Sequence, residues 1–195
     1  SRQALDERMR KRGQDSEDVM AQRLAAARGD RAVVADNRLV GNLHGVDVHG
    51  GIDVQVRGNH IEGRRDRRIN DRGNGIYVWT SPGLVADGNV IDWGRDGILV
   101  TIGRKLTFTN NRFTNLRFAV HYMYAHDSTI AGNVSLSNHL GYALMYSERL
   151  KVRDNVSLND RAQGLMFNYT NNSDVTGNLI RGAEKGVFVY NSHRN

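Results

Sequence analysis

The sequence predicts an all-β protein, a parallel β-helix of about seven coils preceded by a short α-helical segment. Three observations support this fold class: an asparagine that recurs at nearly constant spacing, a small residue that follows it in every repeat, and an alternating apolar run after the small residue. A repeat of roughly 20 to 50 residues is typical of solenoids, in which each repeat packs on its neighbours.

The first thirty residues lack this repeat and have a helical composition. Asp15 and Ser16 precede the acidic Glu17, an arrangement typical of a helix start. We expect residues 1–30 to form a helical segment that either caps the open end of the solenoid or is foreign to it. Residues 31–195 form the predicted β-helix, and because the sequence ends inside a repeat we expect it to be truncated at its C-terminal end.

The recurring asparagines follow one another at spacings of 22, 30, 22, 22, 22 and 23 residues. They are Asn37, Asn59, Asn89, Asn111, Asn133, Asn155 and Asn178. Each follows a short run such as VQVRGN or LKVRDN, which we expect to be a strand. Asparagine tolerates the left-handed conformation of a corner, and its amide can bond backbone groups. Stacked coils would align these amides in a ladder, so we expect their role to be structural.

The small residue lies 14 residues before the next asparagine in every repeat, so all length variation falls between the asparagine and the small residue. The seven small residues are Gly45, Gly75, Gly97, Ala119, Gly141, Gly164 and Gly186. Eight extra residues fall in the repeat that begins at Asn59, within the arginine-rich stretch GRRDRRINDRGNG. This insertion is either a docking loop for an acidic partner or phosphate, or a solvated loop.

A run such as GILVT, AVHYM or GVFVY follows each small residue, and its strict alternation predicts a strand. The first and third positions of the run are apolar in all seven repeats and should face the interior. The second and fourth should face outward, and they are Asp47/His49, Tyr77/Trp79, Leu99/Thr101, His121/Met123, Ala143/Met145, Met166/Asn168 and Phe188/Tyr190.

This outward face is unusually rich in aromatic, thioether and imidazole groups, and three interpretations of it stay open. His121, Met123, Met145 and Met166 would suit a soft metal ion such as Cu(I). Tyr77, Trp79, Phe188 and Tyr190 could stack on sugar rings. The same face could instead be covered by a partner protein, because methionine and aromatic residues are also enriched in such contacts.

Several classes of function have little support. The chain has no cysteine, which excludes disulfides, thiolate metal sites and a cysteine nucleophile. No stretch approaches the roughly 18 apolar residues of a membrane span. A net charge of +6 does not require nucleic acid as a partner. No grouping of carboxylates or nucleophile with base predicts an enzyme, since Asp92, Asp96, Asp127 and Asp154 are dispersed around corners.

The segments RFAVHYMY, NHLGYALMYS, LKVRDN and EKGVFVYN, in this order and at the repeat spacing, resemble the NosD family over about residues 31–195. The resemblance implies a right-handed parallel β-helix in the periplasm and a non-enzymatic role in maturing nitrous oxide reductase in denitrification. It also implies copper as transient cargo, ABC transporter subunits, a copper-chaperone lipoprotein and the apo-reductase as partners, and contact with the membrane only through them. The alternative function is a polysaccharide lyase or C5-epimerase.

Two further consequences follow from resemblance. His121, Met123 and Met145 match the HYM and ALM segments of that family and become the copper candidates, with Met166 one coil further on. Residues 1–30 instead resemble a fragment of guanylate-kinase-like nucleotide kinases. The phosphate-binding loop of those kinases is absent, so we expect no kinase activity.

Overall fold

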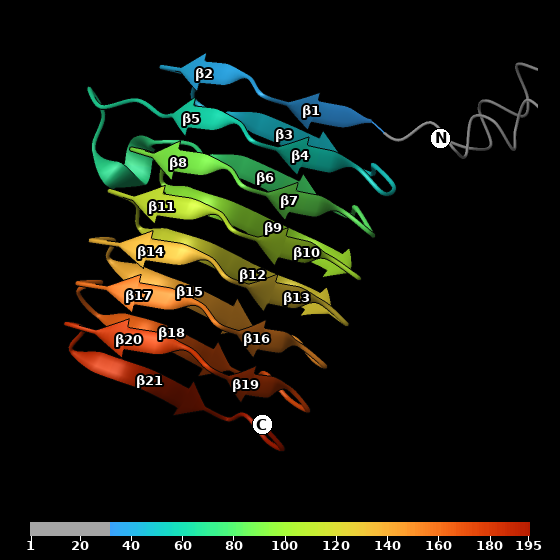
Figure 1. The fold of residues 1–195 in the computed structure, drawn as a ribbon, viewed down its shortest axis with the longest axis vertical. Helices are drawn as coiled ribbons and strands as arrows, with labels where there is room; N and C mark the ends of the chain where they lie inside the picture. Colours follow the sequence, from blue (N-terminus) through green and yellow to red (C-terminus); the bar gives the residue numbers. More distant parts are fainter. Residues whose placement is uncertain (1–31) are drawn as a thin grey trace, which may run out of the picture. The chain divides into compact units, whose positions relative to one another are not determined.

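Residues 32–195 fold into an all-β parallel solenoid of the right-handed type with about seven turns (Figure 1). The structure is a computed structural model, and it describes residues 32–195. Each turn contributes one strand to each of three seven-stranded parallel sheets, here named sheets A, B and C. The predicted fold class is therefore confirmed for the solenoid, whereas the predicted helical segment at residues 1–30 lies outside the described residues.

Sheets A and B consist of strands of three residues each. Sheet A contains β1 (Val33–Ala35), β4 (Gln55–Arg57), β7 (Val85–Asp87), β10 (Thr107–Thr109), β13 (Thr129–Ala131), β16 (Lys151–Arg153) and β19 (Asp174–Thr176). Sheet B contains β2 (Arg38–Val40), β5 (His60–Glu62), β8 (Val90–Asp92), β11 (Arg112–Thr114), β14 (Val134–Leu136), β17 (Val156–Leu158) and β20 (Leu179–Arg181).

Sheet C holds the longer strands, which are the alternating runs of the sequence. They are β3 (Val46–His49), β6 (Ile76–Trp79), β9 (Asp96–Arg104), β12 (Phe118–His126), β15 (Leu140–Met145), β18 (Gln163–Asn168) and β21 (Lys185–Tyr190). The small residue is needed for space in the inner coils: a Cβ at Gly75 would collide with Ile91 and with the carbonyl oxygen of Gly97 in the next coil, whereas a Cβ at Gly186, in the last coil, would meet nothing. Only at Ala119 does the same position hold a methyl group, and it is buried.

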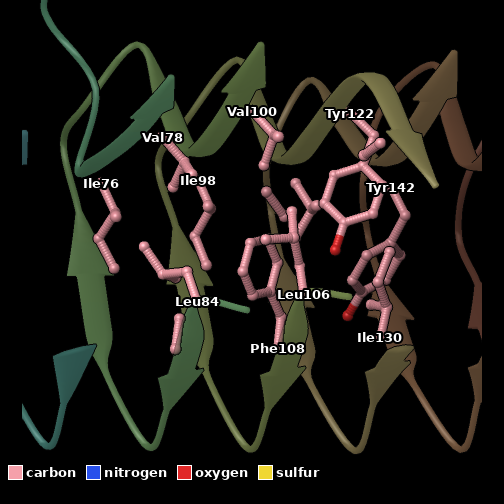
Figure 2. Close-up of a cluster of buried hydrophobic side chains, with 14 of the residues drawn as sticks. Ile76, Val78, Leu84, Ile98, Val100, Leu106, Phe108, Tyr122, Ile130 and Tyr142 are labelled. Carbon is pink, nitrogen blue, oxygen red and sulfur yellow. The ribbon is translucent and has the colours of Figure 1, made fainter. Parts of the chain in front are cut away.

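The interior is a stack of apolar side chains, one layer per coil, as Figure 2 shows. Ile76, Ile98 and Val120 occupy one column of sheet C, and their burial confirms the predicted inward face. Phe108 packs edge-on against Tyr122 with ring centroids 5.4 Å apart. The last coil differs, because no further coil of residues 32–195 packs over β21, and Val187 and Val189 are about half exposed.

An amide ladder runs along the corner between sheets A and B. It is formed by the seven recurring asparagines, and the Nδ2 of each from Asn37 to Asn155 donates to the Oδ1 of the next at 2.9–3.0 Å. The same Oδ1 atoms accept from the backbone N–H of the preceding ladder residue, for example from Asn89 to Asn111. Each amide from Asn59 onward also donates to a carbonyl of an earlier coil, as Asn111 does to Ala86.

The left-handed residue of this corner is the one before each ladder asparagine, which corrects the expectation that the asparagine itself adopts that conformation. Asp36, Gly58, Gly88, Asn110, Gly132, Asp154 and Gly177 have φ between 55° and 66°. The turn places its positive φ one residue earlier, and glycine, asparagine and aspartate are the residues that accept it. The ladder asparagines are thereby free to point inward and bond along the solenoid.

The arginine-rich insertion is folded against the solenoid. It includes a short 3₁₀ helix, η1 (Ile69–Asp71), the one helical element within residues 32–195. The guanidinium groups of Arg65 and Arg72 lie 5.2 and 5.1 Å from the centroid of the Trp93 ring. The expected docking role of this loop stays a prediction. No helix among the described residues is long and apolar enough to cross a membrane.

Candidate functional site on the outer face of sheet C

The outer face of sheet C brings together the residues that the sequence selected as copper candidates. Strands β12 and β15 pair in parallel, so that Met123 lies directly beside Met145. Neighbouring strands are roughly 4.8 Å apart, which places the two thioethers side by side. His121 lies on the same face of β12, two residues before Met123. All three side chains are partly buried on the surface of the sheet.

Met166 is less closely associated with the other candidates. Its register partners are Ala143 in β15 and Phe188 in β21, whereas Met145 pairs with Asn168. Met166 therefore lies diagonal to Met145 and two strands away from His121, roughly 10 Å along the solenoid. Met166 is therefore as near to Met145 in register as His121 is, but it lies two strands from both His121 and Met123.

A buried aspartate holds His121, and the sequence analysis did not anticipate this contact. Asp96 was expected to be one of several dispersed corner carboxylates, but it is the first residue of β9 and its side chain is fully buried. His121 Nδ1 lies 3.0 Å from Asp96 Oδ2. Arg117 makes a two-pronged ion pair to the same carboxylate, Nε to Oδ1 at 2.8 Å and Nη2 to Oδ2 at 2.6 Å.

The charge of Asp96 determines which nitrogen of the His121 ring carries a hydrogen toward it. Burial acts to raise the pKa of Asp96, but hydrogen bonds from His121 and Arg117 and the charge of Arg117 outweigh it and leave the pKa lowered. An ionised carboxylate accepts hydrogen bonds, so Nδ1 of His121 carries a hydrogen toward Asp96. In the neutral imidazole the lone pair then lies on Nε2, which is the arrangement found around many metal-binding histidines.

Phe118 completes the surroundings of the histidine. The Arg117 guanidinium lies 4.4 Å from the centroid of the Phe118 ring, and the ring meets the His121 imidazole edge-on at 4.9 Å between centroids. Together with the carboxylate, these contacts restrict the rotation of the imidazole. The side chain of His121 is 12% exposed. A ligand could therefore approach it only from the outer side.

The four aromatic residues predicted as a partner or sugar surface do not form one patch. Tyr77 and Trp79 belong to β6, whereas Phe188 and Tyr190 belong to β21, with β9, β12, β15 and β18 between them. The first pair instead packs around His49, whose ring centroid lies 5.5 Å from Tyr77 and 5.1 Å from Trp79.

A second ladder, which the sequence analysis missed, borders this face at the corner between sheets C and A. The tyrosine ladder consists of Tyr124, Tyr146 and Tyr169, which stack nearly parallel with ring centroids 5.2 and 5.3 Å apart. Tyr190 meets Tyr169 edge-on at 6.0 Å. The signal was present in the sequence, because the three tyrosines recur at the 22- and 23-residue repeat directly after the fourth strand position.

Harder ligands do not converge in the described part of the chain. No group of three or more histidine, cysteine, aspartate or glutamate side chains within residues 32–195 could hold a metal ion. A site on the outer face of sheet C would therefore rest on one imidazole and two thioethers. Thioethers are soft ligands that select Cu(I) and are unsuited to calcium or magnesium.

Comparison with known proteins agrees with this chemistry. Residues 57–195 match the model of a family described as "Periplasmic copper-binding protein (NosD)". The chain belongs to the NosD family. The predicted resemblance is thereby confirmed, and this is a family of periplasmic proteins. This description attributes copper binding to the family as a whole.

Two curated members of the NosD family are named "Probable ABC transporter binding protein NosD". The protein from Stutzerimonas stutzeri is 35% identical over 84% of this chain and 41% of its own length. The protein from Pseudomonas aeruginosa is 34% identical over 95% of this chain and 46% of its own length. The chain thus spans less than half the length of these relatives. Their names describe binding proteins and associate them with a transporter.

A short segment of the chain is similar in sequence to a different protein. Twenty-eight residues, 14% of the chain, are 96% identical to a guanylate kinase from Xanthomonas axonopodis pv. citri and cover 14% of that enzyme. This confirms the second resemblance as one to a fragment. A match of this length carries no activity to the chain.

Proposed function

We propose that this chain is the copper-handling part of a non-enzymatic periplasmic maturation factor for nitrous oxide reductase. Copper is its cargo, bound transiently by His121, Met123 and Met145 on the outer face of sheet C. Met166 would take part only as copper enters or leaves, because it lies a diagonal step further along the solenoid. ABC transporter subunits, a copper-chaperone lipoprotein and the apo-reductase are the proposed partners.

One observation carries the proposal: the parallel register of β12 and β15 places two thioethers side by side and an oriented imidazole on the same face. Such a set of three soft or borderline donors suits Cu(I), which accepts low coordination numbers and binds thioether sulfur. The ligands come from adjacent strands of a rigid sheet, so their spacing is set by the backbone. A surface position, only partly covered, also suits a metal ion that must be passed on.

The buried Asp96 supports the same assignment. It directs the protonated Nδ1 of His121 inward, so the free Nε2 is the nitrogen available to the metal ion. Arg117 balances the charge of the carboxylate and keeps it in place. We expect an Asp96→Asn variant to bind Cu(I) about 10-fold more weakly, within the range that loss of such outer partners costs.

The polysaccharide alternative has less support from the same face. The carboxylates that border this face are those of Asp47 and Asp96, and both are held in ion pairs. Asp47 pairs with His49 at 2.6 Å, and Asp96 pairs with Arg117 and His121. They belong to different coils, with β6 between their strands. A lyase or epimerase would require carboxylates grouped around one sugar ring.

Titration with Cu(I) in competition with a chromophoric chelator tests the proposal. The double variant Met123→Leu/Met145→Leu keeps the apolar volume and removes both sulfur atoms. We expect its Cu(I) affinity to fall at least about 100-fold, since loss of an outer-shell partner alone costs roughly 10- to 100-fold. Met166→Leu is the matched control, and we expect it to change the affinity by less than about threefold.

An unchanged affinity in the double variant would remove direct copper binding from the proposal. Pull-down of the transporter or the apo-reductase with the same variants then separates the two roles of the face. A variant that binds no copper but still retains the partner would show that docking uses other residues. A variant that keeps copper and loses the partner would assign the methionines to docking.

A further inference from the structure

A cleft opens at one end of the tyrosine ladder, and none of the copper candidates lines it. It has a volume of about 310 Å³ and is lined chiefly by apolar atoms. Thr80, Pro82, Ile102 and Tyr124 form its apolar part, and Arg104 and His126 contribute its polar edge. Its lining residues come from three successive coils, and in each coil they lie at the same corner between sheets C and A.

The cleft lies where the aromatic ladder ends. Tyr169, Tyr146 and Tyr124 stack in successive coils, and the next two coils carry Ile102 and Thr80 at the same position. Within residues 32–195 no other aromatic ring stacks on Tyr124. The Tyr124 side chain lines the cleft together with Ile102.

The backbone around the cleft is strained. Thr80, Ile102 and Tyr124 have φ of 49°, 61° and 58°, in the left-handed region that glycine and asparagine normally occupy. Two of these residues are β-branched, for which positive φ is a clear outlier. Tyr146 and Tyr169 share this conformation in the following coils, so it belongs to the corner of the repeat and is present on both sides of the cleft. The repeat thus keeps side chains at a corner where glycine would fold more easily.

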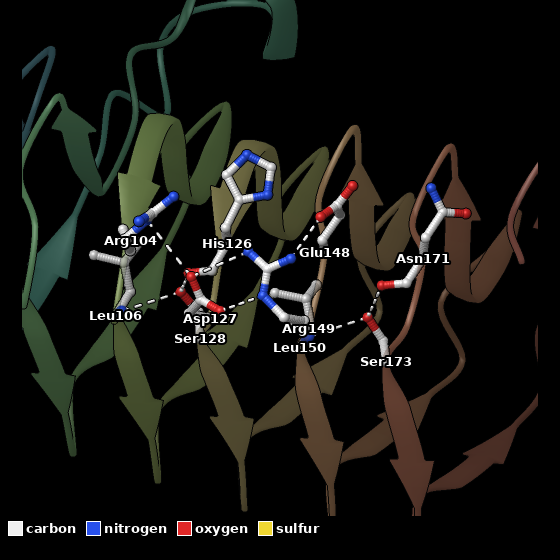
Figure 3. A network of polar contacts seen from close by, with 10 residues as sticks. All are labelled: Arg104, Leu106, His126, Asp127, Ser128, Glu148, Arg149, Leu150, Asn171 and Ser173. Atoms are coloured by element: carbon white, nitrogen blue, oxygen red, sulfur yellow. Dashed lines mark hydrogen bonds and ion pairs between the residues drawn. The ribbon is translucent and has the colours of Figure 1, made fainter. Parts of the chain in front are cut away.

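The polar edge of the cleft carries positive charge with few partners. The Arg104 side chain is 61% exposed, and its single ion pair within residues 32–195 is with Asp127 at 3.5 Å. Arg149 binds the same carboxylate more closely with two nitrogens, as Figure 3 shows. The Nδ1 atom of His126 is buried and has no hydrogen-bond partner among the described residues. A carboxylate beside the cleft would satisfy Arg104 better than its present contact does.

We propose that this cleft binds an aromatic side chain of a partner protein, with a neighbouring carboxylate of that partner against Arg104. The aromatic ring would lie against the side chains of Tyr124 and Ile102, which line the cleft together. The apolar lining favours an aromatic side chain over a sugar, whose hydroxyl groups would find few partners there. Aromatic anchors that fill such pockets dominate the energetics of many protein interfaces.

Methyl-detected NMR of the chain labelled at isoleucine δ1 methyl groups tests the proposal with small probes. The probes are N-acetyl-L-tyrosine and N-acetyl-L-tyrosinamide, which differ in the carboxylate alone. We expect saturable ring-current shifts of the Ile102 methyl signal with both, since this methyl lines the cleft. The carboxylate form should bind about two- to fivefold more tightly, and an Arg104→Gln variant should remove that difference.

Two tyrosine variants provide the matched comparison. Tyr124→Leu removes the aromatic ring that lines the cleft, and we expect it to weaken both probes about three- to tenfold. Tyr169→Leu has the same change at a position of similar exposure and φ, away from the cleft, and we expect less than a twofold effect. The isoleucine signals of the interior report whether each variant is folded.

Other outcomes would overturn the proposal. Equal weakening by Tyr124→Leu and Tyr169→Leu, or no saturable shift of Ile102, would show that the cleft takes no aromatic ring. A methyl glucuronide that bound more tightly than N-acetyl-L-tyrosine would show a saccharide site instead. Preserved preference for the carboxylate in Arg104→Gln would place the acidic contact elsewhere.

Discussion

The solenoid carries two ladders on different corners, and they contrast in every physical respect. The amide ladder between sheets A and B is buried from Asn59 to Asn155, and its amides bond both to each other and to the backbone. The tyrosine ladder between sheets C and A is exposed, and its rings stack through their faces alone. At the first corner the left-handed residue is glycine, aspartate or asparagine, whereas at the second it is the tyrosine itself.

This difference indicates how one repeat can both stabilise the solenoid, through its amide corner, and expose side chains for binding, through its tyrosine corner. At the amide corner, the left-handed positions hold residues that tolerate positive φ, and every buried ladder amide has hydrogen-bond partners. Both features favour stability. The tyrosine corner keeps bulky side chains in an unfavourable conformation and leaves them accessible. Stability alone would favour glycine or asparagine there.

Interrupting the amide ladder should have the largest effect. Asn111→Ala removes an amide that donates to Ala86 and Asn133 and accepts from the backbone and side chain of Asn89. Several buried groups lose their partners, so we expect the free energy of unfolding to fall by about 3 kcal/mol or more. Urea denaturation measures it. Asn37→Ala, at the exposed end of the ladder, should cost less than about 1 kcal/mol and serves as the control.

Equal effects of these two substitutions would contradict the account of the amide corner. They would show that the ladder amides contribute independently of burial. A loss of unfolding free energy below about 1 kcal/mol in Asn111→Ala would also contradict it, since that is the net contribution of a single ordinary hydrogen bond.

Asp96 lies between the two extremes, because it is buried like the amide ladder yet belongs to the proposed functional face. Asp96→Asn keeps the shape but leaves Arg117 without its counter-charge, and we expect a loss of about 2 kcal/mol at neutral pH. Arg117 is partly exposed, so water compensates for some of the loss. Urea denaturation at pH 7 provides the comparison with the unchanged protein.

The same pair of proteins should differ in its dependence on pH. The pKa of Asp96 is lowered from its ordinary value of 3.8 in the folded state. Its contribution to stability is therefore complete above that value and is lost as the pH falls through the lower folded-state pKa. The gap between the unchanged protein and Asp96→Asn should stay constant at neutral pH and narrow below 3.8. A gap that widened in acid would show that the carboxylate is protonated in the folded protein.

The smallest effect on stability is expected in the tyrosine ladder. Tyr146→Asn loses two stacking contacts, each worth about 0.5–1.5 kcal/mol, but places a residue that tolerates positive φ at this corner. We expect the free energy of unfolding to change by less than about 1 kcal/mol in either direction. A loss above about 2 kcal/mol would make the tyrosine ladder a structural element and remove the contrast with the amide ladder.

The repeat was sufficient to predict the architecture. The spacing of the asparagines and small residues fixed the coil length, and the alternating runs identified the inward faces of sheet C. Burial of Ile98, Val120 and Leu144 confirms that interpretation. These features depend on the chain's own periodicity, which is local and repeated seven times.

The contacts between coils were harder to predict. Asp96 seemed isolated in the sequence because its partners Arg117 and His121 lie 21 and 25 residues later and approach it only through the parallel register. Trp93 likewise receives Arg65 and Arg72 from a loop whose path no periodicity describes. The tyrosine ladder could have been predicted from the sequence, since its members recur at the repeat length. They lie one position beyond the four strand positions on which the prediction of inward and outward faces depended.

X-ray absorption spectroscopy of the Cu(I)-loaded chain at the copper K-edge tests the central claim most directly. The account predicts a sulfur shell from Met123 and Met145 together with the multiple scattering of one imidazole, from His121. In the Met123→Leu/Met145→Leu variant the sulfur shell should disappear, while Asn37→Ala should leave the spectrum unchanged. A copper environment of nitrogen and oxygen alone, or a sulfur shell that survives in the double variant, would contradict it.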